Sequence, residues 1–129
     1  MKKSMNQHQK QIKKFCRDRN WNQFHNPKDI LLGMVEEIGE FRNLIKWEQD
    51  PDSINQILIK NKEEAENTIG DILWFLSILS NNLDIDMDKA LKDVIKENEK
   101  RFPLSKTKNK HTNVHFGGHD GKYSKIKSS

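Results

Sequence analysis

Apolar residues recur at helical spacing through most of the first hundred positions, and no segment alternates strictly between apolar and polar residues. This pattern predicts four helices, over residues 5–20, about 27–49, about 62–82, and from a turn at 84–88 to about 102. Because an amphipathic helix must bury its apolar stripe against another element, we expect an all-α protein whose four helices form a bundle.

Prolines mark the ends of these predicted helices. Pro27 suits the first turn of the second helix, where its missing N–H leaves no bond unmade. Asp50 is expected to end that helix, because the residue before a proline, here Pro51, avoids the α conformation. Pro103 is expected to end the fourth helix. Residues 51–61 are expected to connect two helices and to include a short helical piece.

Composition adds a domain division and an expectation of assembly. The length of 129 residues predicts one domain, which we place at residues 1–103. Residues 104–129 form a tail rich in Lys, Ser, Gly and His, a composition typical of a solvated basic segment. Hydrophobic and charged residues each make up 33% of the chain, which is lean for a lone monomer. Burial shared between subunits is therefore expected.

Charge is distributed unevenly along the chain. Residues 1–19 hold seven Lys or Arg and one Asp, and residues 105–129 hold six Lys and one Asp. Residues 20–104 hold ten basic and seventeen acidic side chains. An acidic middle between basic ends favours cation-binding carboxylates with basic arms that neutralise an anionic ligand. Nucleic acid is not expected as a partner.

Cysteine usage and hydropathy limit the compartment. Cys16 is the single cysteine, so a disulfide within the chain and a cysteine-rich zinc site are both excluded, and we expect it to be a small buried residue. The N-terminal MKKSMNQHQK lacks the apolar run of a signal peptide. The segment IGDILWFLSIL is too short to span a membrane. We expect a soluble, cytoplasmic protein with no membrane partner.

The segment LLGMVEEIGEFRNLIKW, residues 31–47, places acidic residues within an apolar helical face. At about 100° per residue, Glu37 lies inside the apolar stripe, Glu40 lies on its border and Glu36 lies outside it. Gly33, one turn before Glu37, leaves room beside it for a ligand or another backbone. A carboxylate in a packed core costs several kcal/mol unless a partner compensates it.

Asp71 repeats this anomaly on the helix predicted at residues 62–82, where Phe75 and Ile78 share its stripe and Thr68 lies on the same side. Carboxylates that converge from two helices repel each other unless a cation lies between them. Mg²⁺ prefers such hard oxygen ligands. An ion pair with Lys or Arg, or a polar subunit interface, is the alternative. The repetition on two helices favours the metal.

Three ordered segments carry a family resemblance: FCRDRNWNQFHNPKDILLGMVEEIGEFRNLIKW, then TIGDILWFL, then NEKRFP. Together they resemble the all-α nucleotide pyrophosphohydrolases of the MazG type, and the WNQFHNP connector resembles their dCTP pyrophosphatase-like branch. The resemblance covers roughly residues 12–103, and GKY at 121–123 is similar to the basic tail of that branch. It implies a four-helix bundle that forms a homodimer or homotetramer, with the site between subunits.

The resemblance also implies an activity: Mg²⁺-dependent hydrolysis of a (d)NTP to (d)NMP and pyrophosphate, with Mn²⁺ as a possible substitute and dCTP or a modified nucleotide as the substrate. The residues implied as catalytic metal ligands are Glu37, Glu40 and Asp71. Those implied to hold the base and sugar are Trp21, His25, Trp47 and Phe75. Those implied near the phosphates are Asn98, Arg101, Lys122 and Tyr123.

Two departures from the family pattern bear on this implied activity. The second acidic pair of the family is ExxD, whereas this chain has Thr68 in place of the glutamate. The branch also carries a lysine on the last helix where this chain has Val94. Glu64 lies on the same helical side as Asp71 but about 10 Å away along the axis, which is too far for a direct substitute. The alternative function is therefore a nucleotide-binding or regulatory protein with weakened catalysis.

Overall fold

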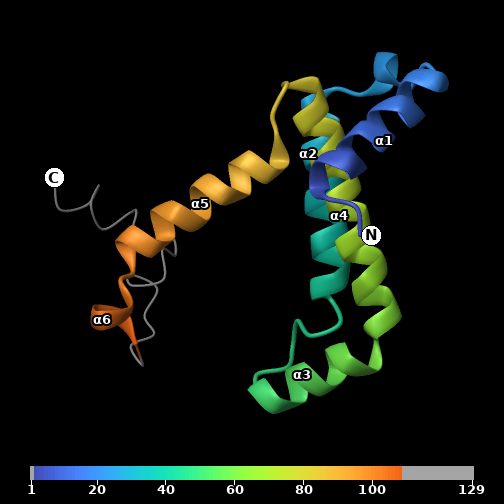
Figure 1. Cartoon of the computed structure of the whole chain (residues 1–129). Helices are drawn as coiled ribbons and strands as arrows, with labels where there is room; N and C mark the ends of the chain where they lie inside the picture. The colour runs from blue at the N-terminus through green and yellow to red at the C-terminus, as the bar shows by residue number, and fades with distance from the viewer. Residues whose placement is uncertain (1, 109–129) are drawn as a thin grey trace, which may run out of the picture. The chain divides into compact units, whose positions relative to one another are not determined.

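The computed structural model describes residues 2–108, and within that range the chain forms helices and no β-strand. The all-α prediction is therefore confirmed for this part of the chain. The elements, shown in Figure 1, are α1 (Met5–Asp18), the 3-10 helix η1 (Trp21–Phe24), α2 (Pro27–Arg42), α3 (Pro51–Lys60), α4 (Lys62–Asn82), α5 (Met87–Arg101) and α6 (Leu104–Thr107). The chain divides into two units after Met87, and each unit is described by itself.

Side-chain caps fix where the helices of the first unit begin. Ser4, Asn26 and Asp50 each accept a hydrogen bond from the backbone N–H three residues further on. Such caps satisfy N–H groups that have no partner inside the helix, and each contributes about 1 kcal/mol. Pro27 and Pro51 follow two of these caps at the first helical position. The predicted start of the second helix is therefore confirmed.

The predicted second helix is too long at its C-terminal end, because α2 stops at Arg42 rather than near residue 49. After Asn43, which caps α2, the hydrogen bonds shorten to three-residue turns: Leu44 N–H donates to the Phe41 carbonyl at 3.2 Å, and Ile45 N–H donates to the Arg42 carbonyl at 3.0 Å. Asparagine favours helix ends over helix interiors, since its amide competes for backbone groups.

The predicted connector at residues 51–61 is instead a complete helix, α3. Asp50 accepts hydrogen bonds from both the backbone N–H and the hydroxyl of Ser53 at 2.9 Å, so it starts this helix. The short α6 also falls where only a tail was predicted. The chain thus has more helices than the four expected, and a four-helix bundle with α5 as its fourth member remains a prediction, as does the domain boundary at residue 103.

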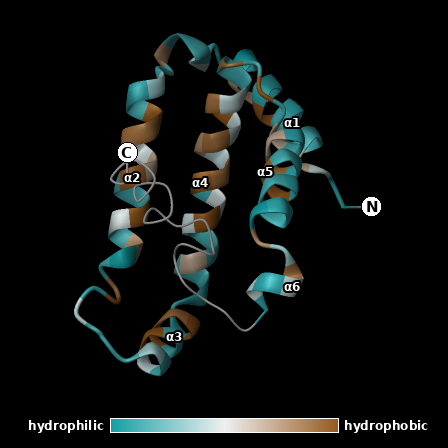
Figure 2. Ribbon diagram, turned by 90° about the vertical axis from the view of Figure 1, so that its left-hand side faces the viewer, coloured by the Kyte–Doolittle hydropathy of each residue, from teal (hydrophilic) through white to brown (hydrophobic). Residues whose placement is uncertain are grey.

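The core of the first unit forms where α4 packs against α1 on one side and α2 on the other. Its buried apolar residues come from all three helices, and they are Cys16, Ile30, Met34 and Ile78. Figure 2 shows hydrophobic positions running along α2 and α4, which lie side by side. Burial of Cys16 is as expected, and desolvation raises the pKa of its thiol, so it stays protonated at neutral pH.

The space beside Gly33 is occupied by an aromatic ring of the same chain. A Cβ atom at Gly33 would lie only 3.0 Å from the Cζ atom of Phe75. The absence of a side chain therefore lets Phe75 of α4 pack directly on the backbone of α2. The prediction that this space receives a ligand or another backbone is wrong, because helix packing fills it first.

A buried amide joins α1 to the turn between α4 and α5. The Gln9 side chain, only 6% exposed, donates to the Ile85 carbonyl at 2.9 Å and accepts from the Met87 N–H at 2.9 Å. Asn81 in turn donates to the backbone carbonyl of Gln9 at 3.1 Å. These bonds satisfy buried polar groups that would otherwise be costly, and they fix α1 against the end of α4.

In the second unit, Lys89 and Asp93 form an ion pair one helical turn apart on α5. Thr107 of α6 donates its hydroxyl hydrogen to the Pro103 carbonyl at 2.8 Å. Of the helices found between residues 2 and 108, none combines the length and apolarity that crossing a membrane requires. A cytoplasmic location remains a prediction.

Candidate active site

Glu37 of α2 and Asp71 of α4 lie opposite each other. The two helices run side by side in opposite directions (Figure 1), and Gly33 meets Phe75 across their interface. One turn further along α2 is Glu37, and one turn back along α4 is Asp71, so the same register brings these two carboxylates together. Both side chains are half-buried. By the same register Thr68 faces the turn of α2 that holds Glu40.

The carboxylates of Glu37, Glu40 and Asp71 act on one another. Partial burial, followed by the negative charges of Asp71 and Glu40, raises the pKa of Glu37 above its ordinary value of 4.5. Glu36 is exposed, as predicted, and Glu40, which was predicted on the border of the apolar stripe, is exposed too. Glu40 therefore sits at the solvent edge of the pair formed by Glu37 and Asp71.

No basic side chain within residues 2–108 forms an ion pair with the carboxylate trio of Glu37, Glu40 and Asp71. The ion pairs found there join Lys14 to Asp18 and Lys89 to Asp93, and neither includes a member of the trio. The alternative prediction, that a Lys or Arg forms an ion pair with these carboxylates, is therefore wrong for the described part of the chain. Mutual repulsion remains unbalanced, which is the condition that a bound cation relieves.

A hydrogen bond and two glycines are found next to members of the trio on α4 and α2. Asn67 donates a side-chain hydrogen bond to the Oδ2 atom of Asp71 at 3.3 Å, one turn earlier on α4. A Cβ atom at Gly39 or at Gly70, next to Glu40 and Asp71 respectively, would meet nothing within 4 Å. The helix surface at these two glycines is therefore open.

The donor chemistry of the trio fits Mg²⁺, which takes carboxylate oxygens together with water. In the part of the chain that is described, no three His, Cys, Asp or Glu side chains already stand in a metal-binding cluster. The trio would therefore draw together around an ion, whose charge cancels their repulsion. Thr68, where the family pattern has a glutamate, is only 6% exposed and contributes no charge. The metal ligands remain a prediction.

An aromatic cluster surrounds η1. The rings of Phe15 and Trp21 meet edge to face with centroids 5.4 Å apart, and Phe15 meets Trp74 at the same distance. Trp21 also meets the His25 ring at 6.5 Å. The buried Nδ1 atom of His25 has no hydrogen-bond partner among the described residues, although such atoms normally have one. Trp21, which is 40% exposed, thus presents an aromatic ring at the surface, whereas the Nδ1 atom of His25 is buried.

Within the first unit, the other predicted substrate residues are not gathered at one place. Trp47 is 85% exposed in the turns after α2, whereas His25 lies just before this helix, whose 16 residues span about 24 Å. Phe75 is half-buried and packs against the core. Asn98 and Arg101 are exposed on α5, in the second unit. The last two predicted residues, Lys122 and Tyr123, lie outside the described residues.

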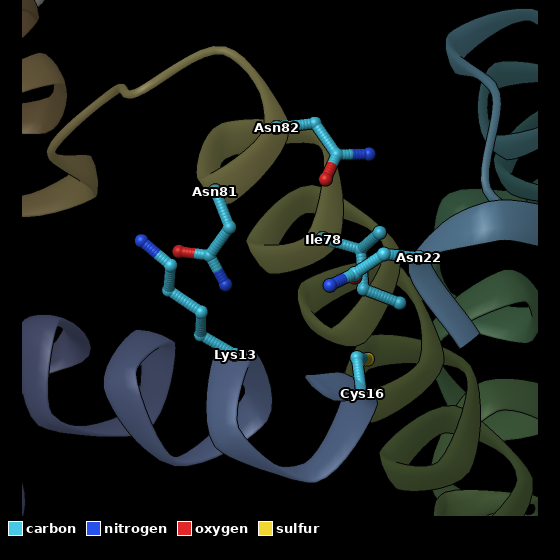
Figure 3. A pocket seen from close by; sticks show the side chains of 6 residues that line it. All are labelled: Lys13, Cys16, Asn22, Ile78, Asn81 and Asn82. Atoms are coloured by element: carbon cyan, nitrogen blue, oxygen red, sulfur yellow. The ribbon is translucent and has the colours of Figure 1, made fainter. Parts of the chain in front are cut away.

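One residue near the trio escaped prediction from the sequence, namely Asn67. Its signal was its spacing of four from Asp71, which places two side chains one above the other on a helix. The hollow in Figure 3, by contrast, holds no candidate site. Its volume is about 40 Å³, which admits a few waters but no nucleotide, and its lining residues are Lys13, Cys16, Asn22, Ile78, Asn81 and Asn82.

A family model for the MazG nucleotide pyrophosphohydrolase domain matches residues 25–105, which include the trio and its helices. The chain belongs to this family. The MazG match covers most of the described residues, and it agrees with the family resemblance of the sequence motifs.

This MazG chain is similar to mammalian enzymes named dCTP pyrophosphatase 1. It is 30% identical to that of Rattus norvegicus and 31% identical to that of Bos taurus, in each case over 91 residues, 70% of this chain and 54% of the relative. The chain thus spans about half the length of these curated relatives. It also resembles the crystal structure of a pyrophosphatase from Archaeoglobus fulgidus, with a TM-score of 0.70, 25% identity, and coverage of 80% of this chain and 95% of the other.

Proposed function

We propose that this MazG protein hydrolyses a nucleoside triphosphate between its α and β phosphates, with Mg²⁺ as its cofactor, to a nucleoside monophosphate and pyrophosphate. The observation that carries the proposal is the trio Glu37, Glu40 and Asp71. Glu37 and Asp71 face each other from two helices with Glu40 at their solvent edge, and none of the three has a basic partner in the described range. Family membership supplies the reaction class that such a cation site serves.

The trio would hold Mg²⁺, and Mn²⁺ is the expected substitute because it also favours carboxylate oxygens. When bound, the ion supplies positive charge for the phosphate oxygens and activates a water. The water oxygen forms a bond to the α phosphorus, the bond from that phosphorus to the α–β bridging oxygen breaks, and pyrophosphate leaves with this oxygen and its electron pair. A carboxylate of the trio accepts the proton that the water loses.

For the substrate, we propose dCTP or a modified nucleotide, since the mammalian relatives are named for dCTP. Trp21, which is 40% exposed, supplies an aromatic face for the base, and the His25 ring lies beside it. Stacking on such a face is worth about 1–3 kcal/mol per base. Phe75 and Trp47 complete the proposed base and sugar residues, and Asn98, Arg101, Lys122 and Tyr123 are the proposed phosphate residues.

A second copy of the chain is part of this proposal. His25 and Trp47 flank opposite ends of α2, a helix about 24 Å long, so we do not expect one chain to bring both to one base. A homodimer or homotetramer with the site between subunits removes this difficulty. Exposed apolar side chains on α2, such as Val35 and Ile38, are consistent with such an interface.

The test is a panel of canonical and modified triphosphates, incubated with the full chain and Mg²⁺ and separated by chromatography. We expect monophosphate and pyrophosphate in equal amounts, and we expect both to be lost in Glu37→Ala and Asp71→Ala. Glu36→Ala, on the exposed side of α2, is the matched control and should retain turnover. Binding of triphosphates with no cleavage across the panel would contradict the proposed activity.

The second candidate function is nucleotide binding or regulation with weakened catalysis. The observation that favours it is Thr68, which removes one expected carboxylate from the site. Under this hypothesis the panel gives tight, Mg²⁺-dependent binding without turnover, and Thr68→Glu restores cleavage. The same panel therefore separates the two functions.

A further inference from the structure

Because of Thr68, the candidate metal site lacks one carboxylate of the family pattern. The family pattern has a glutamate there, but Thr68 is only 6% exposed and its short hydroxyl side chain lies in the packed face of α4. A short buried hydroxyl supplies neither a charge nor the reach of a carboxylate. Glu64, the acidic residue on the same side, lies two turns before Asp71, about 10 Å along the axis.

Asn67, the residue next to Thr68, is close enough to contact Asp71, unlike Glu64. Its side-chain amide donates to the Oδ2 atom of Asp71 at 3.3 Å. Within residues 2–108 no other group donates a hydrogen bond to the side-chain carboxylates of Glu37, Glu40 or Asp71. Asn67 is therefore the one described side chain that holds any member of the trio in a fixed orientation.

An exposed Asn–Asp pair one turn apart can serve only to support a helix, where it is worth about 0.2–0.5 kcal/mol. The position of Asp71 argues for more. Asp71 is half-buried and faces Glu37 across the interface, so a rotation of its carboxylate changes how the trio can converge. Loss of a partner that orients a metal ligand typically weakens metal binding by about 10–100-fold.

We propose that Asn67 is a positioning residue of the metal site, which orients the Asp71 carboxylate through its amide N–H in a chain that lacks the family glutamate at position 68. This inference rests on the proposed function, because it assumes that the trio binds a divalent cation. Its consequence is a site with one negative charge fewer than the family pattern, which holds a single divalent ion per chain.

The test measures Mn²⁺ binding to the full chain without nucleotide, by calorimetry and by the loss of the free-ion electron paramagnetic resonance signal. Asn67→Leu keeps the side-chain size and removes the hydrogen bond, and it should weaken Mn²⁺ binding by about 10–100-fold. Asn55→Leu, the matched control on exposed α3, should bind Mn²⁺ as the unmodified chain does. Circular dichroism verifies that each variant is folded.

A rescue variant separates positioning from a general disturbance of α4. Thr68→Glu combined with Asn67→Leu restores a charged oxygen ligand on the same turn, so Mn²⁺ affinity should recover. Unchanged affinity in Asn67→Leu overturns the inference, and so does a stoichiometry of two ions per chain. Mn²⁺ binding that depends on Asn67, in a chain that cleaves no triphosphate, supports the inference and contradicts only the proposed activity.

Discussion

Glu37 is the residue at which the demands of folding and of the candidate chemistry oppose each other. Its side chain lies in the half-buried interface of α2 and α4, where a leucine would pack without cost. Burial and the charges of Asp71 and Glu40 raise its pKa, so its ionised form destabilises the ligand-free fold. A bound cation reverses that balance, which is how a binding site differs from a packing defect.

The raised pKa of Glu37 predicts a specific dependence of stability on pH. Between the ordinary value of 4.5 and the raised pKa, the folded chain binds more protons at Glu37 than the unfolded chain does. Stability at this residue is therefore present at low pH and is lost as the pH rises through the raised pKa. In Glu37→Gln this loss should disappear, as measured by thermal unfolding in a chelating buffer across acidic to neutral pH.

Glu36→Gln is the control for this pH profile, because it removes the same charge from the exposed side of α2. Its profile should match that of the unmodified chain. Saturating Mg²⁺ at neutral pH should raise the unfolding temperature of the unmodified chain more than that of Glu37→Gln. Equal increases in the two proteins would show that Glu37 does not contact the ion.

Thr68 supports a second prediction at the scale of the residue. Thr68→Glu should tighten Mg²⁺ binding at least several-fold, since it restores a carboxylate one turn before Asp71. Without metal the same variant should be less stable, because it buries another like charge beside Glu40. Calorimetric titration gives the affinity, and Asn55→Glu on α3 adds the same charge elsewhere as a control. Unchanged affinity would show that position 68 does not face the ion.

At the scale of the element, α2 contains two glycines in opposite environments. A Cβ atom at Gly33 would press on the Phe75 ring at 3.0 Å, whereas one at Gly39 would enter open space. Close packing of α2 on α4 therefore depends on the first glycine and gains nothing from the second. Gly33 is therefore needed because its lack of a side chain permits close packing, not because its backbone is flexible.

The two glycines predict stability changes of opposite sign on one helix. Gly39→Ala should stabilise the fold by about 0.5–1 kcal/mol, which is the helix preference of alanine over glycine. Gly33→Ala should destabilise it by about 1–3 kcal/mol, since the Phe75 ring must move. Urea unfolding measures both changes. Equal effects of the two substitutions would contradict the close approach of Phe75 to α2.

The Gln9 amide predicts a third effect, on the junction of α1 with the end of α4. Gln9→Ala leaves the buried Met87 N–H and Ile85 carbonyl without their partner, which should cost about 2–4 kcal/mol of unfolding free energy. Gln11→Ala, an exposed position on the same helix, should cost less than about 0.5 kcal/mol. A small effect at Gln9 would mean that water replaces these bonds.

At the scale of the whole molecule, the described residues bury a small apolar core and leave many large apolar side chains exposed. Leu31, Val35 and Ile38 form a stripe along α2 at positions one turn apart, and each is about half exposed or more. Their side chains are of the kind that pack in a helix interface. Together with the distance between His25 and Trp47, this stripe motivates the proposal of a homo-oligomer.

The stripe predicts that charge on α2 disrupts assembly. Val35→Glu combined with Ile38→Glu should convert a dimer or tetramer into monomers and reduce triphosphate cleavage with it, because two buried charges cost far more than an apolar interface gains. Light scattering after size exclusion measures the mass. Ile59→Glu, at an exposed position on α3, is the control and should leave the mass unchanged. A monomeric unmodified chain would contradict the proposed assembly.

The sequence by itself determined the all-α class, the start of α2, the bounds of α4 and the acidic anomaly of Glu37 and Asp71, because caps, prolines and helical periodicity are local signals. Its motifs also indicated the MazG family. Only the tertiary structure decided that α2 stops at Arg42, that Phe75 fills the space beside Gly33, and that no lysine or arginine in the described range answers the trio. These facts depend on which side chains meet across the helices, and periodicity along one helix does not contain that information.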